Sequence, residues 1–245
     1  DPPEPYASMH NPVAMSLPHR AEGELDRLPP SVRQDATAFG REKMNLWGIP
    51  DTEIRRMRAL YYGNVALIDV WVGRVLEVLK QHGMEEKTLV VFTSDHGDYL
   101  GDHDLIWKGL LPSDADMKVP LLMRWPGKIE SRGCEEFATG VDLMPTILSA
   151  VGMAVPTQCQ GRNLLAACGH ADHAIMFSEP NKWRYRDAKW SYTWWPDQPF
   201  DTLYDLTADP EELNNLCYEC DEPPPVAQQL KIRIQEWLNN STPKP

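Results

Sequence analysis

The chain has 245 residues, a formal net charge of -12 and 42% hydrophobic residues. This length and composition suit one α/β domain with a smaller appended unit. The negative charge argues against a nucleic-acid partner, because no basic patch large enough to offset it is visible. No stretch approaches the roughly 18 apolar residues of a membrane span, so we expect a soluble protein, cytoplasmic or periplasmic, without such a span.

The first part of the chain alternates helix and strand signals. Residues 1–50 are rich in proline and charge and predict a loop-dominated excursion. Apolar residues at helical spacing then predict a long amphipathic helix from Asp51 to the stop at Gly83. The β-branched runs Thr88–Thr93 and Val119–Trp125 predict buried strands, and Asp142–Val151 predicts a short helix.

The character of the sequence changes near Pro156. Short aromatic-rich segments predict strands, and a run after three prolines predicts a final helix; these are Ala174–Phe177, Lys189–Trp194, Thr202–Leu206 and Pro225–Leu238. We therefore expect two units, residues 1–155 as an α/β part and residues 156–245 as a small antiparallel sheet with one helix.

Five cysteines, an odd number, do not form a disulfide framework. Cys217 and Cys220 form a Cys-x-x-Cys pair, but the two further ligands of a zinc site are not evident nearby. We interpret the pair as unremarkable, with a local disulfide or a metal as the alternative.

The polar segment after the first predicted strand carries the chemistry. Asp95 and His96 follow the strand directly, and Gly97 lets the chain turn away sharply. A carboxylate and an imidazole together suit a divalent ion of intermediate hardness, although two ligands are too few to hold one alone. Without further context the pair could instead cap a helix or join a hydrogen-bond network.

Ser94–His103 has the sequence Ser-Asp-His-Gly-Asp-Tyr-Leu-Gly-Asp-His, followed by Lys108-Gly109 and by Val-Pro-Leu-Leu-Met-Arg-Trp-Pro-Gly at 119–127. In order and spacing these motifs resemble the sulfatase family of the alkaline phosphatase superfamily. Leu203-Tyr204-Asp205-Leu206 and the residues after it resemble the family's C-terminal signature. The resemblance implies an incomplete alkaline phosphatase-like three-layer α/β/α sandwich with a small C-terminal antiparallel sheet and helix.

By position, the resemblance implies that Asp95 and His96 are two ligands of one divalent metal ion, calcium first, with manganese or magnesium as alternatives. It implies that Lys108 contacts the sulfate group being transferred. A metal and a lysine would supply fixed positive charge where charge develops on the ester oxygen. His103 is expected either to bind substrate or protonate the leaving group, or to make a supporting hydrogen bond.

The chain lacks three features of the family pattern and differs in a fourth. It has no upstream acidic metal ligands, and neither the Cys/Ser-x-Pro-x-Arg motif, whose Cys or Ser becomes the formylglycine nucleophile, nor the His-x-Pro loop stands at its family position. Ser-Leu-Pro-His-Arg at 16–20 and His-Asn-Pro at 10–12 match the two patterns by letter but lie further along the chain. All three features precede, in the family, the segment that begins at Asp1. We therefore expect a missing N-terminal portion of the same protein as a partner, and a chain that is inactive alone. Leu110–Asp114 replaces the usual aromatic-acidic stretch, which leaves the pocket shape open.

The function that these features predict is metal-dependent hydrolysis of a sulfate monoester, on a small molecule or a sulfated sugar. A phosphonate monoester or phosphodiester hydrolase of the same superfamily is the close alternative, because an Asp-His pair of metal ligands serves both chemistries. A noncatalytic binding or scaffold module is the alternative of another class. The upstream sequence would separate an enzyme from a scaffold.

Overall fold

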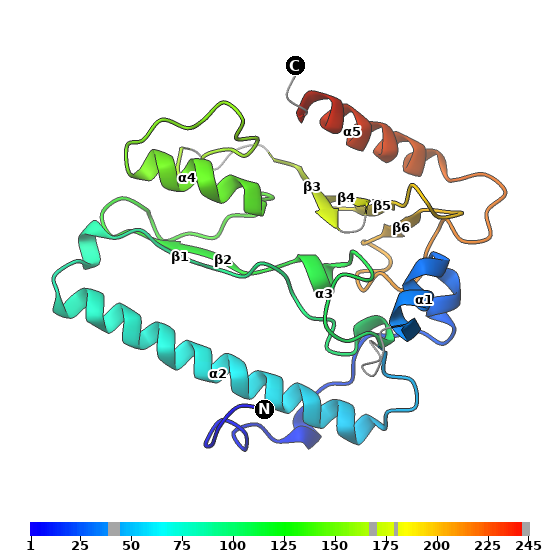
Figure 1. Cartoon of the computed structure of the whole chain (residues 1–245), viewed down its shortest axis with the longest axis horizontal. Helices are drawn as coiled ribbons and strands as arrows, with labels where there is room; N and C mark the ends of the chain where they lie inside the picture. Colours follow the sequence, from blue (N-terminus) through cyan, green and yellow to red (C-terminus); the bar gives the residue numbers. More distant parts are fainter. Residues whose placement is uncertain (39–44, 167–170, 179–180, 242–245) are drawn as a thin grey trace.

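The computed structural model describes residues 1–38, 45–166, 171–178 and 181–241 (Figure 1). Its helices and strands, in chain order, are α1 (Pro30–Ala38), α2 (Asp51–Gln81), β1 (Val90–Thr93), α3 (Asp114–Met117), β2 (Leu121–Arg124), α4 (Leu143–Ala150), β3 (His173–Ser178), β4 (Lys182–Asp187), β5 (Trp190–Trp194), β6 (Thr202–Asp205) and α5 (Pro225–Ser241). Short 3-10 turns lie at Pro12–Ala14, Glu24–Arg27, Glu85–Lys87, Asp102–Asp104 and Gly140–Asp142.

The N-terminal part of the chain is built around a long helix and a two-stranded sheet. Helix α2 follows the predicted bounds, with Asp51 and Glu53 in its first turn, where carboxylates complement the helix dipole. Beyond its end, Gly83 takes a positive φ of 62°. β1 pairs with β2 in antiparallel register, and in Figure 1 this sheet runs between α2 and α4. The predicted helices and strands of this part are thus confirmed in position, but the prediction that the strands are buried is wrong for this chain, because β1 and β2 are half-buried to exposed.

The C-terminal part of the chain forms a four-stranded antiparallel sheet in the order β3-β4-β5-β6, with α5 packed on it. The shared core is formed by Tyr185, Tyr192, Leu203, Cys217, Ala227, Leu230 and Ile234. The predicted strands correspond to β3, β5 and β6, and the predicted final helix to α5. β4 was not predicted, because Lys182 and Arg184 lie on its buried side and do not give a hydrophobic alternation.

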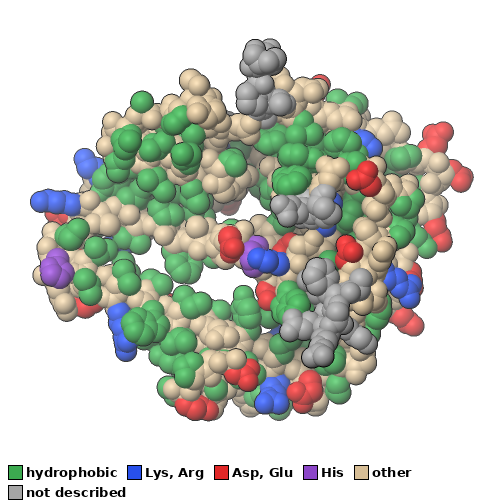
Figure 2. Space-filling model, viewed as in Figure 1, with side chains coloured by type: hydrophobic (Ala, Val, Ile, Leu, Met, Phe, Trp, Pro, Cys, Tyr) green, Lys and Arg blue, Asp and Glu red, His purple; other side chains and the backbone are tan. Residues whose placement is uncertain are grey.

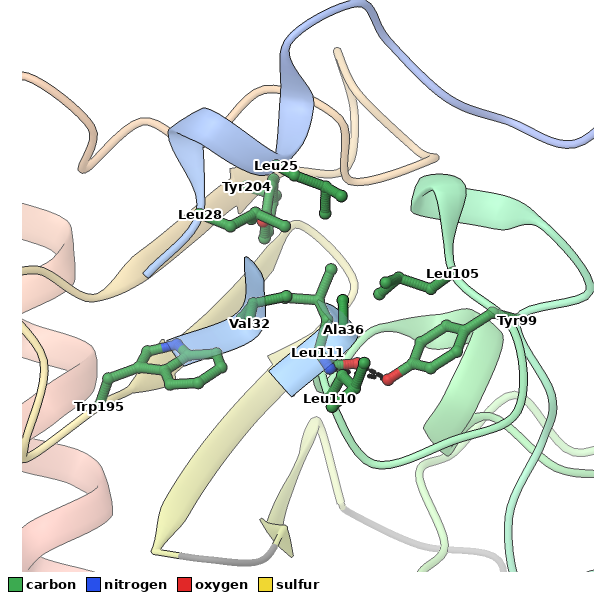
Figure 3. Packing of buried hydrophobic residues seen from close by; sticks show 10 residues of the cluster. All are labelled: Leu25, Leu28, Val32, Ala36, Tyr99, Leu105, Leu110, Leu111, Trp195 and Tyr204. Atoms are coloured by element: carbon green, nitrogen blue, oxygen red, sulfur yellow. Dashed lines mark hydrogen bonds between the residues drawn. The ribbon is translucent and has the colours of Figure 1, made fainter. Parts of the chain in front are cut away.

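A second cluster of buried residues joins distant parts of the chain (Figure 3). Its members are Leu25, Leu28, Val32, Ala36, Tyr99, Leu105, Leu110, Leu111, Trp195 and Tyr204. They come from the N-terminal segment, from the motif loop and from the C-terminal sheet. The N-terminal residues are mostly loops, as predicted, but helix α1 was missed and contributes Val32 and Ala36 to this core.

Large apolar side chains stay exposed on α2, on the β1–β2 sheet and around α4. They include Tyr62, Val65, Ile68, Trp71, Val75 and Val78 of α2, Phe92, Leu121 and Leu122 of the sheet, and Val141, Met144, Ile147 and Val151 around α4. Figure 2 shows openings on both sides of the middle layer, with hydrophobic side chains around them. Contiguous apolar faces of this extent mark surfaces that another part of a protein covers.

Two further sequence expectations concern the cysteines and the membrane. Cys134, Cys159, Cys217 and Cys220 are free thiols, so the Cys217 and Cys220 pair forms no disulfide. The fifth, Cys168, lies outside the described residues. Within the part of the chain that the structure describes, no helix is both long and apolar enough to cross a bilayer.

Candidate active site

The turn after β1 places Asp95 and His96 and depends on a close backbone approach. The backbone N–H of Gly97 donates to the carbonyl oxygen of Asp116 at 2.6 Å. A Cβ atom on Gly97 would stand 2.1 Å from the carbonyl oxygen of Ala115, closer than any real contact of that kind. Only glycine therefore lets the turn that carries His96 pack against α3.

The ring of His96 is held in one tautomer. Its Nδ1 lies 2.7 Å from the carbonyl oxygen of Gly97, which can only accept, so Nδ1 carries the hydrogen. The other nitrogen, Nε2, then carries the lone pair, toward which the Lys108 ammonium donates. Nε2 lies 3.4 Å from Oδ2 of Asp95 and 2.5 Å from Nζ of Lys108. A backbone carbonyl in this position is the usual partner of a metal-binding histidine.

Of the three side chains Asp95, His96 and Lys108, the Asp95 carboxylate faces solvent, with 81% of its side chain exposed. A hydrogen bond from its own backbone N–H lowers the pKa of Asp95, and the charge of Lys108 lowers it further. The carboxylate is therefore ionised at neutral pH, and its oxygen and the His96 lone pair are spaced as two neighbouring ligands of one ion. These residues fit part of a divalent metal site.

The rest of such a site does not lie in this chain as described. Among residues 1–38, 45–166, 171–178 and 181–241, no three His, Cys, Asp or Glu side chains gather closely enough to hold a metal ion. Two ligands leave a hard cation largely hydrated, so an ion held firmly here would need further ligands.

Lys108 reaches His96 from a strained loop. Trp107 before it has φ of 67° and Gly109 after it has φ of 85°. A positive φ is costly for an aromatic residue, and such strain clusters at functional sites. The carboxylate of Asp98 accepts the backbone N–H groups of Trp107 and Leu100, which stabilises the turn. Lys108 itself is exposed, so its ammonium is available to a bound anion.

His103 has a different environment from the other predicted residues. Its side chain is 2% exposed, and Nδ1 lies 2.5 Å from Oε1 of Glu24, which is equally buried. Burial opposes protonation of the ring, but the hydrogen bond and charge of Glu24 outweigh it, so the pKa of His103 is raised. This geometry favours the supporting hydrogen bond over contact with substrate; proton donation by His103 stays a prediction.

Asp116 is a neighbour that the sequence did not single out. Its Oδ2 accepts the backbone N–H of Gly109 at 3.1 Å, while its buried Oδ1 has no hydrogen-bond partner. Burial raises the pKa of Asp116, which the Gly109 hydrogen bond and the charges of His96, Lys182 and Lys108 partly offset. The sequence places Asp114 and Asp116 two residues apart and does not indicate which of the two carboxylates faces the site.

Comparison with known proteins decides the family. A sequence model described as Sulfatase matches residues 13–153, more than half of the chain. The chain belongs to the sulfatase family. Among its relatives is the multifunctional alkaline phosphatase superfamily protein PehA of Trinickia caryophylli, 34% identical over 74% of this chain and 35% of its own length. Mouse arylsulfatase K is 31% identical over 77% of this chain and 37% of its own length.

Solved structures place this sulfatase chain in the alkaline phosphatase-like fold. A phosphonate monoester hydrolase of Agrobacterium radiobacter superposes with a TM-score of 0.84 at 25% identity, over 98% of this chain and 54% of that one. The enzyme SpPMH of Silicibacter pomeroyi gives 0.80 at 26% identity, over 97% and 52%. The predicted fold class is confirmed, and the chain spans about a third to a half of the length of the relatives that it matches.

Proposed function

We propose that the complete protein is a metal-dependent hydrolase of sulfate monoesters, in which Asp95, His96 and Lys108 form one wall of the active site. The observation that carries the proposal is the geometry of His96. One nitrogen is tied to a backbone carbonyl, and the other faces both a carboxylate and an ammonium within 3.4 Å. An acceptor, a lone pair and a cation at one exposed point suit a divalent ion together with an anionic group.

The proposed roles follow from the charges. Asp95 and His96 would hold the ion, calcium before manganese or magnesium, which when bound supplies Lewis-acid polarisation of the ester. Lys108 donates a charged hydrogen bond to the sulfate group being transferred. The oxygens of this group carry negative charge, and the charge redistributes as the ester bond breaks. His103, paired with Glu24, positions the loop that leads to Lys108. The attacking nucleophile, a formylglycine, would come from a portion upstream of Asp1.

That upstream portion is also proposed as the chain's main partner. The exposed apolar faces of α2, the β1–β2 sheet and α4 are surfaces that a larger α/β domain would bury. The lone chain holds two proposed metal ligands, and none of its cysteines lies in a Cys-x-Pro-x-Arg motif. We therefore expect the 245 residues alone to be catalytically silent, and the substrate to be a sulfated small molecule or sugar.

Phosphonate monoester or phosphodiester hydrolysis is the second candidate. The observation that favours it is the fold match to two phosphonate monoester hydrolases over nearly the whole chain. A noncatalytic scaffold is the third, and it predicts an upstream sequence in which the Cys/Ser-x-Pro-x-Arg motif is broken.

The test uses the protein as its gene encodes it, stripped of metal and then reloaded with calcium or manganese. Rates are measured on the sulfate monoester and the phosphonate monoester of one phenol. A metal-restored kcat/KM that is higher on the sulfate supports the proposal, and a higher value on the phosphonate supports the second candidate. No turnover of either ester, despite an intact upstream motif, would contradict both.

A further inference from the structure

Side chains hold both the backbone N–H and the backbone carbonyl of Gly109, the residue that follows Lys108. On one side, Oδ2 of Asp116 accepts the backbone N–H of Gly109. On the other, Nζ of Lys182 donates to the carbonyl oxygen of Gly109 at 2.8 Å and to that of Leu110 at 3.0 Å. Lys182 belongs to β4 of the C-terminal sheet, more than 70 positions away in the chain. A side chain of the second unit thus fixes the backbone of the proposed active site.

The backbone of Leu111 is held by a side chain in the same way. The hydroxyl of Tyr99 accepts the backbone N–H of Leu111 at 2.7 Å and donates to its carbonyl oxygen at 2.8 Å, as the dashed lines in Figure 3 show. The polar backbone groups of Gly109 and Leu111 are therefore all held by side chains. Lys108, directly before them, is exposed and points its ammonium at His96. A fixed backbone next to a free functional side chain is the arrangement that preorganises a site.

Burying the ammonium of Lys182 costs desolvation free energy, so its contacts in the interior must compensate for that cost. It is 5% exposed, and its ammonium also lies 5.0 Å from the centre of the Trp195 ring. Burial lowers the pKa of Lys182 to about 8, and the charges of Asp35 and Asp116 partly offset this, so the ammonium stays charged at neutral pH. Two backbone carbonyls and an aromatic face satisfy a charge that would otherwise be strongly unfavourable in the interior.

We propose that Lys182 is a positioning residue for Lys108, through which the C-terminal sheet holds the catalytic loop in register with the Asp95 and His96 turn. The inference rests on the proposed role of Lys108 and goes beyond it. It makes the small second unit part of the catalytic apparatus rather than an appendage. Lys182 does not touch the reacting group and acts only through the Gly109 and Leu110 carbonyls.

The test compares Lys182→Met with Lys182→Arg in the protein as its gene encodes it. Lys189→Met is the matched control, because Lys189, in the turn between β4 and β5, also lies over a tryptophan ring, but it is exposed and pairs with Asp205. Lys182→Met should lower kcat by roughly 10- to 100-fold with KM changed less than threefold, as for a small misplacement of a catalytic group. Lys182→Arg should recover at least half of that loss on a logarithmic scale, and Lys189→Met should change kcat less than twofold.

A purely structural role is separated by two further readouts. In a Lys108→Ala background, Lys182→Met should cost less than threefold, because its effect is routed through Lys108; independent effects would multiply instead. Amide hydrogen exchange in the peptide 105–112 should quicken at least tenfold in Lys182→Met and stay unchanged in Lys189→Met. If Lys182→Met does not fold, Lys182→Gln takes its place with the same expected directions.

The outcomes separate this inference from the proposed function. Full kcat in Lys182→Met, multiplicative losses with Lys108→Ala, or unchanged exchange in 105–112 would each overturn the role of Lys182. Full activity in Lys108→Ala would instead overturn the proposed function, and the inference with it. The exchange measurement needs no substrate. It tests whether Lys182 restrains the backbone of residues 105–112, whether or not the protein hydrolyses a sulfate ester.

Discussion

Arg184 of β4 and Asp114 of α3 form an ion pair at 2.6 Å in which the guanidinium is 1% exposed. The same guanidinium lies 2.7 Å from Glu212, and Arg186 lies 3.0 Å from the second oxygen of Asp114. This buried network joins the C-terminal sheet to the segment between Lys108 and β2. Removing one partner of a buried pair leaves a charge without compensation, which typically costs roughly 3–5 kcal/mol.

The first prediction concerns this network. Arg184→Met should lower the free energy of unfolding by about 3–5 kcal/mol, because Asp114 and Glu212 would be left without their shared partner. Arg56→Met is the control, since Arg56 is 63% exposed and should change stability by less than about 0.5 kcal/mol. Urea unfolding followed by tryptophan fluorescence measures both. Equal midpoints for the two variants would show that the buried network contributes nothing.

The second prediction concerns acid. Burial opposes ionisation of Asp114, but Arg184 and Arg186 outweigh it and lower the pKa of Asp114 to about 2. Because the folded pKa lies below the unfolded value of 3.8, this stabilisation is complete above about pH 4 and is lost as the pH falls toward 2. Between pH 5 and pH 3 the native protein should lose about 1 kcal/mol more stability than Asp114→Asn. Parallel pH profiles would contradict the depressed pKa.

The third prediction tests the turn after β1. Gly97→Ala should destabilise the protein by about 1–3 kcal/mol, because the added Cβ meets the Ala115 carbonyl and the turn must shift. Gly133→Ala is the control, since a Cβ there meets nothing within 4 Å. Thermal unfolding compares the two variants, and metal affinity should fall only in Gly97→Ala. A Gly97→Ala protein as stable and as metal-binding as the control would mean that the close approach does not exist.

The fourth prediction tests the metal ligands. Asp95→Ala removes an exposed, ionised carboxylate and should lower calcium or manganese content after dialysis by at least tenfold in the protein as its gene encodes it. Asp221→Ala, at another exposed carboxylate, should bind as the unaltered protein does. Elemental analysis of the folded proteins gives the answer. Undiminished metal in Asp95→Ala would remove Asp95 from the site.

The sequence predicted those elements whose burial follows a simple pattern. The helical spacing after Pro50 predicted α2, and the β-branched run before Ser94 predicted β1. β4 was missed because its buried face carries Lys182 and Arg184 in place of apolar residues. Their partners, the Gly109 carbonyl and Asp114, lie far away in the chain, so the local sequence does not show that these cations are buried. Helix α1 was missed because the surrounding prolines and charges hide a short apolar face that only the tertiary core reveals.

The same limit applies to the site. Asp95, His96 and Lys108 were predicted together, and the structure brings their side chains together. The motif gave His103 two possible roles, and only its burial against Glu24 favours one of them. Asp116 and Lys182 were not predicted, because both act on the Gly109 backbone through contacts that no local pattern encodes.

The most direct test of the central claim is the kcat/KM of Lys108→Ala on an aryl sulfate in the metal-loaded protein as its gene encodes it. Lys108 is exposed and packs in no core, so its loss should leave the melting temperature nearly unchanged while kcat/KM falls by roughly 10²- to 10³-fold, as for one transition-state donor. Lys128→Ala, at another exposed lysine, should retain full activity. A loss of less than about threefold in Lys108→Ala would place Lys108 outside the active site and contradict the account.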